Sequence, residues 1–164
     1  MMLAFQLYWE RYMNKKYFSI GLALVLGAGY SLTAFSQAKP ETLVKQRQAA
    51  MTLQGKYWGP LGGMAQGKVP YDANTVARNA GYLEVLTKLA WDGFVPSTKD
   101  VKSAALPAVF TDTAKFKEAQ DHLQSEVGKL VAVSKSGDEA AVKAQLVATG
   151  KACGGCHETF REKQ

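Results

Sequence analysis

The chain has 164 residues, of which 47% are apolar and 21% charged, with five prolines, two cysteines and two histidines. This length suits one ordinary domain with or without a targeting segment, and the composition is too apolar for a disordered chain. Two cysteines are too few for a fold built on disulfides. The formal net charge of +6 would suit a nucleic-acid partner only if the basic residues were clustered.

The first 36 residues have the layout of a secretory signal. Two lysines precede an apolar run that extends to about Phe35, where small residues follow. We expect cleavage before Gln37 and a true translation start at Met13, because residues 1–12 precede the basic start of the signal. The alternative is an uncleaved anchor, because the run approaches the length of a membrane span. The signal predicts a protein that works outside the cytoplasm.

Charge in the remaining chain, residues 37–164, is dispersed. Three basic residues and one acidic residue leave with the signal, so the formal charge falls to +4. The only arginines that remain are Arg47, Arg78 and Arg161, and no basic run is interleaved with aromatic residues. This pattern excludes a nucleic-acid partner and indicates lysines on solvated helix faces.

Two amphipathic helices are predicted in the first half of the mature chain. One extends from about Pro40, which suits a first helical position, to about Tyr57. The other begins at the N-cap residue Asp72 and presents apolar positions through Ala90. The glycine-rich stretch at 59–71 is expected to connect them.

Two more helices are predicted in the second half. One starts at Asp112, and its apolar residues recur with a clean helical period from Phe116 to Leu130. The other is expected to start at Ser136 as the N-cap of a capping box with Glu139, and to continue through Phe160. Four amphipathic helices predict an all-α fold, an antiparallel four-helix bundle, in which the longer connections at 59–71 and 92–111 close the ends of a cavity.

The segment Cys153-Gly154-Gly155-Cys156-His157 carries the chemistry. It is the C-x-x-C-H pattern of c-type haem attachment. Positions i, i+3 and i+4 share one helix face, so both sulfurs and the imidazole point the same way. The thiols are then placed to form thioether bonds to the haem vinyl groups while the imidazole reaches the iron.

Three other interpretations of this segment are weaker. A disulfide between Cys153 and Cys156 would close a very short loop and leave His157 without a role. A thioredoxin-like thiol pair follows a strand, and no strand pattern lies nearby. Zinc needs four ligands, and the only other histidine, His122, lies far away in the sequence.

With this motif near its C-terminus, the chain resembles the cytochrome c′ family, the class II c-type cytochromes, over residues 39–164. The resemblance rests on five segments: Lys39-Pro40-Glu41, Arg47-Gln48, Pro70-Tyr71-Asp72, Trp91 to Phe94, and Cys153 to Arg161. It implies one covalent haem c near one end of the bundle, attached to the last helix, and a periplasmic protein that is free of the membrane after signal cleavage.

The resemblance also implies roles for single residues. His157 matches the proximal iron ligand, and Met51 matches the apolar side chain that covers the opposite face. Arg47 and Gln48 match positions that hydrogen-bond a haem propionate, although a surface arginine remains the alternative for Arg47. Arg161 matches a basic residue near the proximal face, with a plain helix C-terminal cation as the alternative.

The role of Met51 divides the functional hypotheses. If Met51 only shields the iron, the site is five-coordinate and binds NO and CO, with electron transfer as a further role. If its sulfur ligates the iron, the protein is a six-coordinate electron-transfer cytochrome. An enzyme acting on peroxide or NO is not expected, because the first helix offers no acid–base group near Met51. The resemblance also implies redox partner proteins and a homodimer that forms through the first two helices.

Overall fold

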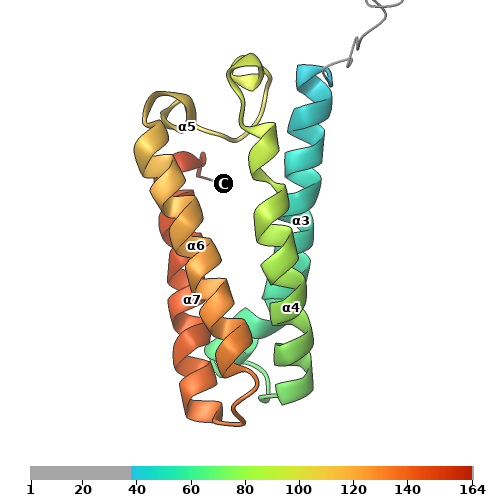
Figure 1. Cartoon of the computed structure of the whole chain (residues 1–164), viewed down its shortest axis with the longest axis vertical. Coiled ribbons are helices and arrows are strands. Elements are labelled where there is room, and N and C mark those ends of the chain that lie inside the picture. The colour runs from blue at the N-terminus through green and yellow to red at the C-terminus, as the bar shows by residue number, and fades with distance from the viewer. Residues whose placement is uncertain (1–37, 164) are drawn as a thin grey trace, which may run out of the picture. The chain divides into compact units, whose positions relative to one another are not determined.

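The computed structural model describes residues 38–163, so the predicted signal and its cleavage site lie outside the described residues. Within this range four long helices form an antiparallel bundle (Figure 1), which confirms the predicted fold. The long helices are α3 (Pro40–Ala65), α4 (Ala73–Leu89), α6 (Thr113–Val133) and α7 (Glu139–Phe160). Each packs against two neighbours around the bundle. None of the helices in residues 38–163 is long and apolar enough to cross a membrane.

Helix α3 is longer than predicted. It continues through Pro60 to Ala65, whereas the sequence pattern placed its end near Tyr57 and a connection over 59–71. A proline inside a helix removes one backbone hydrogen bond. The buried side chains of Leu61 and Met64, which are 0% and 6% exposed, keep the helix against the core beyond that point. Tertiary packing therefore overrides the proline.

Side-chain caps define the starts of the other long helices. Asp72 accepts a hydrogen bond from the Thr75 amide at 2.6 Å, which confirms the predicted start of α4. Asp112 caps α6 in the same way, as predicted. The predicted cap at Ser136 is wrong, because Asp138 accepts from the Ala141 amide at 3.0 Å and α7 begins at Glu139.

The reason for the shifted cap is the turn that precedes α7. Gly137 adopts a left-handed backbone conformation with φ of 76°, which ends the turn and leaves Asp138 at the helix start. The Ser136 hydroxyl instead donates to the Val133 carbonyl at 2.8 Å, closing the preceding helix.

The core forms two clusters. The larger joins all four long helices and includes the fully buried Leu61, Val76, Leu130 and Leu146. The smaller, here called the aromatic cluster, is built on Val109, Phe116 and Phe160, with Trp91, Phe94 and Phe110 among the residues packed against it. Trp91 contacts both clusters.

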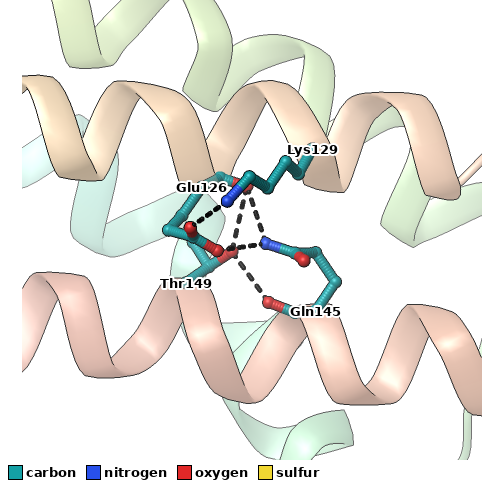
Figure 2. A network of polar contacts seen from close by, with 4 residues as sticks. All are labelled: Glu126, Lys129, Gln145 and Thr149. Atoms are coloured by element: carbon teal, nitrogen blue, oxygen red, sulfur yellow. Dashed lines mark hydrogen bonds and ion pairs between the residues drawn. The ribbon is translucent and has the colours of Figure 1, made fainter.

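A polar network joins α6 to α7 beside the larger cluster (Figure 2). The Glu126 side chain accepts from Lys129 Nζ at 2.7 Å and from Gln145 Nε2 at 2.6 Å. The buried Thr149 hydroxyl donates to the Gln145 carbonyl at 2.9 Å. The two bonds to the Glu126 carboxylate lower its pKa, the bond from Lys129 more than the bond from Gln145.

The connection between α4 and α6 crosses one end of the bundle, the same end at which the C-terminus lies (Figure 1). Predicted as a loop over 92–111, it contains three short helical turns: η1 (Trp91–Gly93), η2 (Pro96–Thr98) and α5 (Ala108–Thr111). Residues of this connection line a cavity of the bundle, whereas no residue of 59–71, the other connection predicted to close a cavity, lines it.

Candidate cofactor-binding site

A cavity of about 660 Å³ lies among the helices of the bundle. Its lining comes from all four long helices, from the α4–α6 connection and from the residue after α7. The structure brings together at this cavity every site residue predicted from the sequence: Arg47, Gln48, Met51, Cys153, Cys156, His157 and Arg161. The volume is that of a site for a sizeable organic ligand.

The two cysteines and the histidine lie on the cavity-facing side of α7. The helix is continuous through the two glycines between the cysteines, as the shared-face argument requires. A Cβ atom at Gly154 or Gly155 would meet no atom within 4 Å, so no contact within the described protein accounts for these two glycines.

The ionisation of these side chains follows from their partial burial. Burial raises the pKa of Cys153 to about 11, with a smaller contribution from Cys156, whose own thiol pKa burial also raises. Burial and then the positive charge of Arg161 lower the pKa of His157. A neutral imidazole is the form that binds a metal.

Arg47 is a buried cation without a carboxylate partner. Only 3% of the residue is exposed, and no carboxylate within residues 38–163 forms an ion pair with it. Burial lowers the pKa of its guanidinium. Burying an unpaired charge is costly, so the side chain is suited to an anion inside the cavity. A carboxylate-bearing cofactor fits this demand.

The other predicted residues lie on the rim and the wall of the cavity. Gln48 is exposed, and Met51, one turn after Arg47 on α3, is half-buried. Arg161 directly follows α7, where its backbone amide donates to the His157 carbonyl at 3.1 Å. Their places agree with the predicted contacts, although the roles themselves stay predictions.

The aromatic cluster forms a large part of the apolar wall. Phe116 packs edge-on against Trp91, Phe94 and Phe160, with ring centroids 5.0 to 6.1 Å apart across the cluster. All four rings line the cavity. Among the described lining residues, His157 is the one histidine and no aspartate or glutamate is present.

Sequence reasoning missed the partners of Arg47. The guanidinium donates to the Gly93 carbonyl at 2.6 Å, to Thr98 Oγ1 at 3.0 Å and to Ser103 Oγ at 2.9 Å. These residues lie in a connection without helical periodicity, so no pattern singles them out. An arginine on an apolar helix stripe was the only signal that buried acceptors were needed.

Comparisons with known proteins agree with this geometry. A family model described as Cytochrome C' matches residues 42–161. Cytochrome c' of Rubrivivax gelatinosus is 44% identical over 126 residues, which cover 76% of this chain and 98% of that protein. Its crystal structure has a TM-score of 0.72 and 42% identity, over 76% of this chain and 98% of that one. A nitric oxide complex of a variant cytochrome c prime from Alcaligenes xylosoxidans has a TM-score of 0.70 and 36% identity, over 77% and 98%.

Proposed function

Because the chain belongs to the cytochrome c′ family and is therefore a c-type haem protein, we propose that it is a periplasmic gas-binding protein. In this proposal a five-coordinate iron, held by His157, binds NO and CO and exchanges electrons. The observation that carries the proposal is that Met51 and His157 reach one apolar cavity from α3 and α7, with no second histidine among its described lining. The nitric oxide complex of a relative supports it.

The chain's own residues divide the work of holding the group. Cys153 and Cys156 anchor it covalently, and the neutral His157 imidazole is the protein ligand. The Arg47 guanidinium and the Gln48 amide, which both line the cavity, would hydrogen-bond a carboxylate of the cofactor. The haem supplies an iron that binds diatomic ligands and exchanges single electrons.

Selectivity follows from the side chains on the opposite wall. Met51 and the rings of Phe94, Phe116 and Phe160 are apolar and offer no hydrogen-bond donor to a polar ligand. Neutral diatomics such as NO and CO need no such donor. We propose a binding protein rather than an enzyme, because the described lining holds no carboxylate or second imidazole for acid–base chemistry.

A second candidate function rests on Met51. Its thioether lies at the cavity, and a methionine sulfur is an iron ligand in electron-transfer cytochromes. With Met51 as a sixth ligand the protein would be a low-spin electron carrier that binds external gases poorly.

Absorption spectra of the exported holoprotein test both candidates. The ferric and ferrous forms are recorded before and after CO is added. A high-spin spectrum that shifts with CO supports the open site. A low-spin spectrum with a sulfur-to-iron charge-transfer band, unchanged by CO, overturns it in favour of Met51 ligation. Measured turnover of peroxide or NO above that of free haem would contradict the assignment as a binding protein.

The partners proposed are a second copy of the chain and a redox protein. Large apolar side chains on α3 and α4 are unusually exposed: Leu53 at 42%, Tyr82 at 46%, Val85 at 59% and Leu89 at 55%. Such a surface suits self-association. Sedimentation equilibrium of the wild type and of Val85→Glu tests it, with a monomeric variant expected and a monomeric wild type contradicting the homodimer.

A further inference from the structure

Residues 93–106, here called the strap, cross the end of the bundle at which α7 ends (Figure 1), and several of them line the cavity. One edge of the strap is fixed to α3 by a single side chain. Both donors of Arg47 Nη1 are used, one by the Gly93 carbonyl and one by Thr98 Oγ1, and Nη2 donates to Ser103 Oγ. One guanidinium thus binds three acceptors that are spread over eleven residues of the strap.

The strap approaches α3 very closely at its first residue. A Cβ atom at Gly93 would lie 2.7 Å from the Leu43 carbonyl oxygen and 2.8 Å from the Cβ of Arg47, so only glycine permits this contact. The ring of the next residue, Phe94, lies against the guanidinium, with Arg47 Cζ 4.4 Å from the ring centroid. Phe94 is thereby held in the cavity wall.

The other edge of the strap is joined to the end of α7. The Leu106 amide donates to the Phe160 carbonyl at 3.0 Å, and the Glu162 amide donates to the Ala104 carbonyl at 2.8 Å. Ala105 and Arg161 form an antiparallel bridge between them. The strap therefore connects Arg47 on α3 to Arg161, which lies one turn after the proposed ligand His157 and donates its backbone amide to the His157 carbonyl.

We propose that Arg47 is a positioning residue of the ligand site, acting through the strap on Phe94 and Arg161. Three of its five N–H donors hold the strap, and the remaining two are free of protein acceptors within residues 38–163 and available to a cofactor carboxylate. One planar guanidinium joins the strap to the cofactor, which a lysine cannot do. The inference rests on the proposed haem site and deepens it.

The test separates the strap contacts from the charge of Arg47. In the double variant Thr98→Val/Ser103→Ala the guanidinium stays, but two of its three strap acceptors are gone. The variant also loses bonds within the strap, from the Thr98 hydroxyl to the Gly93 and Val95 carbonyls and from the Ala105 amide to Ser103 Oγ, so only a change that Arg47→Lys shares reports on the guanidinium. Arg47→Lys removes the branched guanidinium group and keeps the positive charge. Arg78→Lys is the control, since within residues 38–163 Arg78 bonds only to its neighbours Thr75 and Asn79 on α4. The holoproteins are compared by amide hydrogen exchange and by the rate of CO association with the ferrous form, well below their unfolding temperatures.

The proposal predicts that the double variant and Arg47→Lys both raise exchange at the strap amides by about fivefold or more, as expected where an ordinary hydrogen bond is lost. Both should also change the CO association rate by more than about twofold while the control does not. Wild-type behaviour of the double variant in either measurement overturns the proposal, because Arg47 would then act on the carboxylate alone or the strap would not reach the ligand site.

Failure of the proposed function gives a different result. If the wild-type protein binds no CO, gas binding fails regardless of the variants. The midpoint potential of the haem then replaces the CO rate as the second measurement. An unchanged potential in the double variant, beside a normal control, overturns the positioning role in that case as well.

Discussion

Phe116 lies at the centre of the aromatic cluster, and its replacement by leucine tests how this wall of the cavity is stabilised. The residue is 6% exposed. Its ring centroid lies 6.0 Å from that of Trp91, 5.0 Å from that of Phe94 and 5.1 Å from that of Phe160, in edge-to-face arrangements. Leucine keeps most of the apolar burial but none of these ring contacts.

The expected cost follows from this geometry. An edge-to-face aromatic pair contributes about 0.5–1.5 kcal/mol beyond the area it buries, and Phe116 takes part in three. The three contributions share one ring and do not add fully. We therefore expect Phe116→Leu to lower the free energy of unfolding by about 2–3 kcal/mol, including the small loss of volume.

Denaturant unfolding of the holoprotein, followed by far-ultraviolet circular dichroism, measures this change. The matched control is Phe110→Leu, because Phe110 packs against the same cluster without a close ring pair in the described structure. The control should lose less than about 1.5 kcal/mol. Equal losses in the two variants would refute the reasoning, since the ring contacts of Phe116 would then contribute nothing.

Three further predictions concern single polar or glycine positions. Glu126→Gln should lower the free energy of unfolding at neutral pH, because the wild-type carboxylate stabilises the fold while it is ionised. The difference between variant and wild type should shrink as the pH falls from about 5 through the lowered folded-state pKa of Glu126. Denaturant titrations that give the same difference at every pH would contradict this. Asp138→Ala should cost about 1 kcal/mol in thermal unfolding and Ser136→Ala much less, since Asp138 is the cap, and the reverse order would mean that α7 starts earlier. Gly93→Ala should cost about 1–3 kcal/mol, because its Cβ would lie 2.7 Å from a backbone oxygen, and unchanged unfolding would show that the strap moves away freely.

Helix starts were predictable from the sequence where one capping residue stood directly before a clear period. Asp72 and Asp112 meet this condition, and both cap as expected. The start of α7 was not predictable in detail, because Ser136 and Asp138 are both good caps and the left-handed Gly137 between them decides the outcome. The end of α3 depends on packing of Leu61 and Met64 that no local signal at Pro60 reveals.

The candidate site was likewise predictable only in part. The attachment motif fixes its own geometry through helix spacing, so Cys153, Cys156 and His157 lie at one cavity as predicted. For Arg47 the resemblance implied a contact with the cofactor, with a surface arginine as the alternative, and the residue is buried and lines the cavity. Its three acceptors come from a connection 46 to 56 residues away, and only the assembled fold brings them together.

The division of the core into two clusters has a consequence for the cooperativity of unfolding. The cavity is lined by members of both clusters, Leu123 and Val127 from the larger one and Phe116 and Phe160 from the aromatic one. Among the described side chains, Trp91 packs against both clusters. A cofactor in the cavity would contact both clusters, and its covalent attachment would prevent its loss on partial opening. We therefore expect the attachment of the cofactor to make the unfolding of the bundle more cooperative than its own side chains alone would make it.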